Sequence, residues 1–207
     1  MNIRPAHRSD ALSIATAHML AWREAYSHIL PAEFLAGLSI PDRAGRWEQI
    51  ISAGESSTFV AEVGNEALAF SSYGRCRDAE APPSRGEIWA LYATPSCWRK
   101  GMGRALLQHA IADLTSQGYA ETSLWVLSAN ERGRLFYEAN GFAKVPGSEK
   151  PFELGGVQVL ELQYLHRNAA QPFLQADPPS AFRLSQTLVP PIFSLFKSCI
   201  FKTHSPL

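Results

Sequence analysis

The chain has 207 residues, which suits one compact domain and a shorter additional segment, and 46% of its residues are hydrophobic, enough for a buried core. Nineteen basic residues balance nineteen acidic ones, so no net charge favours binding to nucleic acid or to an anionic membrane. Three widely spaced cysteines, Cys76, Cys97 and Cys199, support neither a disulfide framework nor a zinc site, and no apolar run is long enough to span a bilayer, so we expect a cytoplasmic protein without a bound metal.

The first half of the chain predicts helices followed by a β-hairpin. Apolar residues from Leu12 to Ile29 recur at spacings of three and four, which predicts an amphipathic helix with Ser9 as its N-cap and Pro31 beyond its end. Gly64 and the following Asn65 separate two apolar runs and favour a tight turn. The expected elements are a strand over 2–4, helices over 9–30, 32–38 and 42–53, the last two separated by Pro41, and strands over 58–63 and 67–73.

The second half predicts alternating strands and helices. A charged loop over 74–85 contains Pro82 and Pro83, and a loop of this kind often borders a site. Gly118 ends the helix with the clearest apolar period, and Asn130 is a candidate cap for the next one. The expected elements are a strand over 87–93, a helix over 103–117, a strand over 121–127, a helix from 130 to 139, and strands over 142–146 and 157–164.

The composition changes near residue 168. Residues 168–207 contain six prolines and only four charged residues. We therefore expect a domain over 1–167 and an apolar, proline-rich tail over 168–207, either disordered or loosely docked. Helical spacing in the tail leaves open that it docks on the domain or on a partner, through Ile192, Leu195, Phe196, Cys199 and Ile200.

The segment from Thr94 to Ala105 joins a strand to a helix through a basic, glycine-containing turn. The free N–H groups of a helix N-terminus attract anions, and glycines allow a phosphate to come close. A plain strand-to-helix turn is the alternative. The nucleoside-triphosphate loop Gly-x-x-x-x-Gly-Lys-Ser/Thr is absent, and a dinucleotide fingerprint is disfavoured by Leu106 and Ser123 at its third glycine and acidic positions.

Three motifs together resemble the GNAT superfamily of acyl-coenzyme A-dependent N-acetyltransferases, over residues 2–166. Gly101 and Gly103 match its Gln/Arg-x-x-Gly-x-Gly/Ala motif, in which this chain has Trp98 at the first position. Asn130 and the run from Phe136 to Phe142 are similar to the family's Asn…Tyr-x-x-x-Gly-Phe signature. The third motif is Ile-Arg-Pro-Ala at residues 3–6, followed by a helix containing Ala-Trp-Arg at 21–23.

The resemblance implies a mixed α/β (α+β) fold of three layers. Its mostly antiparallel sheet is flanked by helices and splits in a V between the fourth and fifth strands, where acetyl-coenzyme A binds as co-substrate. The implied cofactor-binding residues are the main chain of Leu91, Tyr92 and Ala93, the turn residues Arg99, Lys100, Gly101, Met102, Gly103 and Arg104, and Asn130.

Two catalytic roles also follow from the resemblance. Glu87 matches the general-base glutamate of some members, and its alternative is a strand-edge carboxylate that is solvated or paired with Arg85. Tyr137 aligns with the general acid of the family, and a phenol near pKa 10 keeps its proton at neutrality. Its alternative is a core tyrosine beside Phe136, and Asn130 serves equally as an N-cap.

The expected activity is acetyl transfer from acetyl-coenzyme A to a primary amine of a small molecule, a peptide or a protein. The rival hypotheses are a non-catalytic acyl-coenzyme A-binding sensor and an interaction protein that acts through its tail. Trp22, Tyr26 and Trp89 either wall the acceptor cleft or pack in the core. A homodimer is left open, and no nucleic-acid partner is expected.

Overall fold

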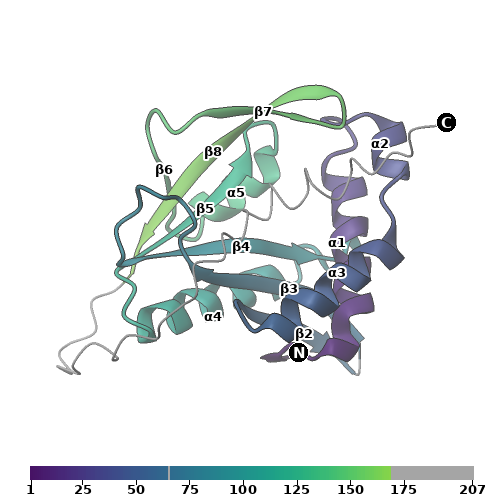
Figure 1. Ribbon diagram of the computed structural model, residues 1–207, viewed down its shortest axis with the longest axis horizontal. Coiled ribbons are helices and arrows are strands. Elements are labelled where there is room, and N and C mark those ends of the chain that lie inside the picture. Colours follow the sequence, from purple (N-terminus) through teal and green to yellow (C-terminus); the bar gives the residue numbers. More distant parts are fainter. Residues whose placement is uncertain (65, 169–207) are drawn as a thin grey trace. The chain divides into compact units, whose positions relative to one another are not determined.

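An eight-stranded sheet runs through the part of the chain that the computed structural model describes, residues 1–64 and 66–168 (Figure 1). The strand order is β1-β2-β3-β4-β5-β8-β6, with β7 also paired to β8. Every pair is antiparallel except β4 and β5. The strands are β1 Asn2–Pro5, β2 Ser57–Val63, β3 Glu66–Arg75, β4 Arg85–Ala93, β5 Glu121–Leu127, β6 Ala143–Lys144, β7 Lys150–Leu154 and β8 Val157–Arg167. This mixed, mostly antiparallel sheet confirms the expected fold class.

Helices lie on both faces of the sheet (Figure 1). On one face α1 and α3 bury a cluster that includes Ile14 and Trp47 against Phe70. On the other face α4 buries Leu107 and its neighbours against β3, β4 and β5, and α5 adds partly buried aromatic rings. The helices are α1 Ala11–Ala25, α2 Ala32–Ala36, α3 Ile40–Ala53, α4 Met102–Ser116 and α5 Glu131–Glu138, with short 3₁₀ turns η1 Arg8–Asp10 and η2 Pro95–Cys97.

Three expectations about the first helices are wrong. Ser9 does not cap α1, because it lies in η1, and Leu12 is 60% exposed rather than on the buried face. The carboxylate of Asp10 instead accepts a hydrogen bond from the His7 amide (2.7 Å) at the start of α1. Pro41 does not separate two helices, because it falls in the first turn of α3, where a missing N–H costs nothing.

The strands agree more closely with the sequence pattern. The hairpin at Gly64, the strand β5 over 121–127 and the helix capped by Asn130 are confirmed. The strand expected over 142–146 shrinks to the two residues of β6, and β8 continues to Arg167. The pattern missed β7, because Pro151 and exposed polar residues hide its alternation. The expected tail falls outside the described residues, apart from Asn168.

The pairing of β4 creates the V-shaped split that the family resemblance implied. A bulge at Trp89 shifts the register with β3, so Ala90 faces Ser72 while Ile88 faces Tyr73. β4 pairs with β5 only as far as Ile88 and Leu124. From 89 to 93, the edge of β4 that faces β5 therefore has no strand partner in the described part of the chain.

Candidate functional site

The turn between β4 and α4 has a backbone shaped by two left-handed residues. Gly101 has φ 85° with nothing within 4 Å of a side chain built on it, and Arg99 has φ 61°. A left-handed conformation costs a non-glycine residue about 1–2 kcal/mol, so the turn stores strain at Arg99. Strain of this kind gathers at ligand clamps.

The N-terminus of α4 presents unused donors at this turn. Gly101 has no side chain to cap the helix, and the first backbone bond of the helix runs from the Ala105 N–H to the Gly101 carbonyl (3.0 Å). The N–H groups of Met102, Gly103 and Arg104 therefore have no intrahelical acceptor. The side chains of Arg99, Lys100 and Arg104 are exposed around them, so the turn is suited to an anion, whereas the Met102 side chain is buried.

Gly103 allows α5 to pack closely on α4, in addition to allowing a phosphate to come close. A Cβ at this position would lie 3.7 Å from the ring of Phe136, so α5 packs directly on the start of α4. From the sequence, Gly103 is expected only to let a phosphate come close. A branched side chain here would push against Phe136 and alter the turn.

The cap of α5 is built as expected. The Asn130 side-chain oxygen accepts a hydrogen bond from the Gly133 amide (3.0 Å). The Asn130 side chain also interacts with the Tyr26 hydroxyl. Asn130 thus ties α5 to the residue that follows α1, and its contact with the cofactor stays a prediction.

Tyr137 lies among aromatic rings, with its hydroxyl near that of Tyr92. Its ring contacts those of Phe136 (5.2 Å between centroids) and Phe142 (5.8 Å). Burial, and then the neighbouring Tyr92, raise the pKa of Tyr137 well above its usual value near 10. The hydroxyl therefore keeps its proton at all physiological pH values.

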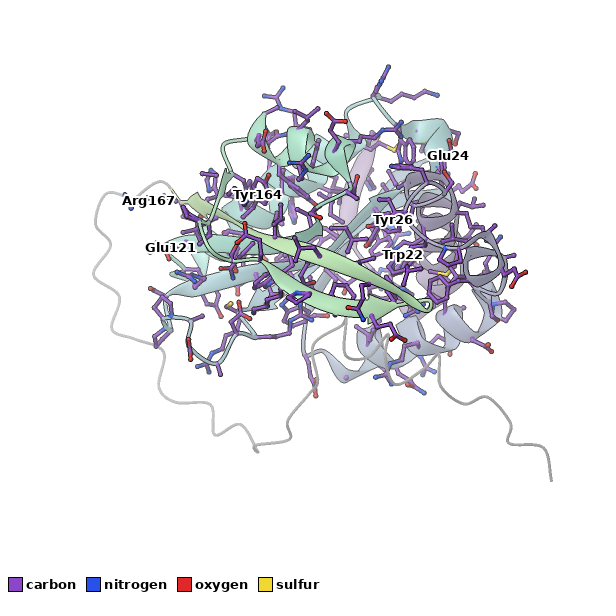
Figure 2. All side chains as sticks on the ribbon, turned by 90° about the horizontal axis from the view of Figure 1, so that it is seen from above. Trp22, Glu24, Tyr26, Glu121, Tyr164 and Arg167 are labelled. Carbon is purple, nitrogen blue, oxygen red and sulfur yellow. The ribbon has the colours of Figure 1, made fainter. Side chains whose placement is uncertain are left out.

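Tyr92 contributes a side chain that the sequence argument did not consider. Its ring stacks on His18 at 4.4 Å between centroids, and its hydroxyl interacts with Tyr26 and Trp22. Figure 2 shows Trp22 and Tyr26 close together. They lie away from Glu121, the first residue of β5, and from Arg167, the last residue of β8. Trp22 is 1% exposed and Tyr26 5%, so both fill the core, the packing alternative for these rings.

The side chain of Glu87 is buried and ion-paired. It is 3% exposed and forms an ion pair with Arg77, whose main-chain N–H also donates to it (2.9 Å). Arg77 in turn lies over the ring of Trp89, 4.7 Å from its centroid. The alternative in which Glu87 is solvated or pairs with Arg85 is wrong, because Arg85 pairs with Glu121 (3.0 Å). Sequence reasoning missed Arg77, which lies in the charged loop after β3.

The described residues offer neither a metal site nor a membrane-spanning helix. Residues 1–64 and 66–168 hold no group of three or more His, Cys, Asp or Glu side chains placed to bind a metal ion. Over the same ranges, none of the helices has the length and apolar character that a bilayer crossing requires.

A sequence profile described as the Acetyltransferase (GNAT) family matches residues 19–142. The chain belongs to the GNAT acetyltransferase family. It is 30% identical over 163 residues to the uncharacterized N-acetyltransferase YuaI of Bacillus subtilis (strain 168), an alignment that covers 78% of this chain and 90% of YuaI. It is also 30% identical to the protein named "Probable N-acetyltransferase Rv2775" of Mycobacterium tuberculosis (strain ATCC 25618 / H37Rv), over 82% of this chain and 95% of the relative.

Solved GNAT structures share the fold at low sequence identity. An N-acetyltransferase from Staphylococcus aureus Mu50 superposes with a TM-score of 0.66 and 18% identity, over 81% of this chain and 98% of that one. The yncA protein of Salmonella typhimurium, solved with its cofactor acetyl-CoA, gives a TM-score of 0.63 and 18% identity over 85% and 98%. The family and the two relatives, and not these distant structures, make the protein an acetyl-CoA-dependent N-acetyltransferase.

Proposed function

We propose that this enzyme acetylates a primary amine of a small molecule, a peptide or a protein, with the coenzyme bound along the open edge of β4. The observation that carries the proposal is the end of β4–β5 pairing at Ile88, which leaves residues 89–93 unpaired with β5 on the approach to the basic turn before α4. The main chain of Leu91, Tyr92 and Ala93 would pair with the pantetheine arm. The pyrophosphate would accept hydrogen bonds at the start of α4.

The basic turn supports this placement of the pyrophosphate. The N–H groups of residues 102–104, together with the positive end of the α4 dipole, favour an anion. Arg99, Lys100 and Arg104 add three exposed positive charges around it. Asn130, at the start of α5, would contact the arm from the other side of the split.

In the reaction the amine nitrogen forms a bond to the acetyl carbon, the carbon–sulfur bond breaks, and one proton leaves nitrogen while the sulfur leaves as a thiolate. Tyr137 is the proposed donor to that sulfur. An alkyl thiol such as cysteine has a pKa near 8.5, below that of a phenol near 10, so complete transfer of the Tyr137 proton would be unfavourable. Tyr137 therefore acts by donating a hydrogen bond to the developing thiolate, and the raised pKa of its hydroxyl keeps the proton in place for this role.

Glu87 remains the proposed acceptor of the amine proton. Its oxygens already accept hydrogen bonds from the Arg77 guanidinium and main chain. The amine proton would therefore reach Glu87 directly only if Arg77 moved aside, and otherwise through a water molecule. This requirement makes Arg77 part of the proposal.

The test is a free-thiol release assay with acetyl-CoA and a panel of polyamines, aminoglycosides, amino acids and N-terminal peptides. Tyr137→Phe should lower turnover about 100-fold, in the range found when one hydrogen-bond donor to a developing charge is removed, with unchanged acetyl-CoA affinity. Tyr73→Phe is the matched control, since its hydroxyl donates to Asp113 of α4 (2.9 Å). Equal turnover in the two variants would return Tyr137 to a packing role. Coenzyme binding without thiol release from any amine would favour the sensor hypothesis.

We also propose that residues 1–167 form the catalytic domain and 168–207 a separate tail. The domain boundary is supported by β8, which ends at Arg167 and completes the described sheet. A cytoplasmic location is supported by the use of acetyl-CoA and by the free thiols of Cys76 and Cys97. Cell fractionation checks the location.

A further inference from the structure

Trp98 occupies the motif position at which the family places a Gln or Arg that contacts the coenzyme. Its indole carries a single N–H, which donates to the Ala93 carbonyl at the end of β4 (2.9 Å). The ring also packs, partly buried, against the cluster that contains Ala93 and Met102. Trp98 therefore has no donor left for a phosphate oxygen.

A positive charge from another element lies over that ring. The guanidinium carbon of Arg132, in the first turn of α5, is 4.3 Å from the centroid of Trp98. Arg132 is exposed, and no carboxylate of the described residues forms an ion pair with it. Its five N–H donors are thus held beside the turn with no acidic partner.

The packing of α5 fixes where this charge points. Phe136 lies one helical turn after Arg132, on the same face of α5, and its ring packs at Gly103. Arg132 and Phe136 therefore contact the two ends of the turn over 98–103, one at Trp98 and one at Gly103. Stacking on an aromatic ring holds a guanidinium plane while its edge stays available to an anion.

We infer that Arg132 binds a phosphate of coenzyme A, with Trp98 as the platform that orients its guanidinium. The inference rests on the proposed placement of the coenzyme phosphates at the 98–104 turn. It assigns to a residue of α5 the charge that the family usually places within the turn. The phosphate is either in the pyrophosphate or at the 3′ position of the ribose, and both present the oxygens that arginine recognises.

The test compares the dissociation constants of acetyl-CoA for the full-length wild type, Arg132→Ala and Arg132→Lys, measured by calorimetry. Loss of one charge-assisted contact should weaken binding about tenfold in Arg132→Ala, and less in Arg132→Lys. The melting temperature without ligand should stay unchanged. Arg8→Ala is the charge-matched control, because Arg8 is exposed in η1 and pairs only weakly with Glu48 (3.7 Å).

The platform and the phosphate are tested by two further arms. In the double variant Trp98→Leu/Arg132→Ala, the loss of affinity should be smaller than the sum of the two single losses. With 3′-dephospho-acetyl-CoA, a persisting effect of Arg132→Ala assigns the pyrophosphate, and a vanishing effect assigns the 3′-phosphate. Equal affinities of wild type and Arg132→Ala, or a fall in turnover number alone, would overturn the inference. Failure of the wild type itself to bind acetyl-CoA would instead refute the proposed function.

Discussion

Replacing Glu87 with glutamine separates a catalytic role of this residue from a structural one. The substitution keeps the size of the side chain and one acceptor oxygen but removes the charge that faces Arg77. Arg77 is 18% exposed, and its Nη1 has no hydrogen-bond partner among the described residues, so the variant leaves the guanidinium poorly compensated. Removing one partner of a buried pair costs about 3–5 kcal/mol, and since glutamine still accepts one bond we expect about 3 kcal/mol.

Replacing Arg77 instead of Glu87 should lower the free energy of unfolding further. Arg77→Gln leaves a carboxylate that is only 3% exposed without its counter-charge, for which we expect a loss of about 5 kcal/mol. The double variant replaces the ion pair with two amides, so its stability should exceed what the two single losses predict by addition. Denaturant unfolding of the four proteins measures these differences. A Glu87→Gln protein as stable as the wild type would refute the argument from the buried ion pair.

The same variants decide the role of Glu87 in proton transfer. An α-amine with a pKa near 8 is mostly protonated at low pH, so loss of a general base should reduce turnover most there. Thiol release is measured from about pH 6 to about pH 9, below the unfolding temperature of each variant. Arg77→Gln frees the oxygens of Glu87 and should retain the low-pH activity that Glu87→Gln loses. A ratio of wild-type to Glu87→Gln rates that is constant across pH would exclude Glu87 as the proton acceptor.

Three further predictions follow from other parts of the molecule. Acetyl-CoA at about 100 times its dissociation constant should stabilise the wild type by about 2.7 kcal/mol, which raises its melting temperature. Gly103→Val should lose this rise in melting temperature. Gly103→Ala should keep it, because its Cβ would lie 3.7 Å from Phe136. Burial, and then the charge of Arg43, lower the pKa of His18 well below its usual 6.5. Near pH 6 only the unfolded state binds this proton, so the free energy of unfolding should fall as pH drops below about 6.5. His18→Phe should reduce this dependence on pH, measured by unfolding between about pH 7 and pH 5. A chain ending at Asn168, whose amide donates to the Ala120 carbonyl (2.9 Å), should fold and retain thiol release, and loss of either would place the domain boundary further along the chain.

The parts of the fold that the sequence predicted are those with strong local signals. The strand over 121–127 is rich in large apolar residues, and Asn130 caps α5 by accepting a hydrogen bond from an N–H only three residues along the chain. The prediction that Ser9 caps α1 was wrong because the Asp10 carboxylate accepts a hydrogen bond from the His7 amide and pairs with Arg4 (2.7 Å). These interactions outweigh the ordinary preference of serine for the cap.

The site was predictable only where it is local in sequence. The glycine turn and Tyr137 belong to short motifs, and the structure places them at the open end of β4 and in the adjacent α5. The partners of Glu87 and Trp98 depend on contacts between separate elements, so no spacing revealed Arg77 or Arg132. Arg132 follows Asn130 by two residues, but only packing shows that it faces the turn.

The unpaired edge of β4 makes the enzyme without coenzyme resemble a sheet with a missing strand. Edges with free N–H and C=O groups invite pairing with any extended chain, including the edge of another molecule. A pantetheine arm that occupies residues 91–93 would satisfy those groups as an added strand does. The coenzyme would then protect the protein against edge-to-edge aggregation in addition to supplying the acetyl group, and preparations kept saturated with acetyl-CoA should scatter less light on storage than those without it.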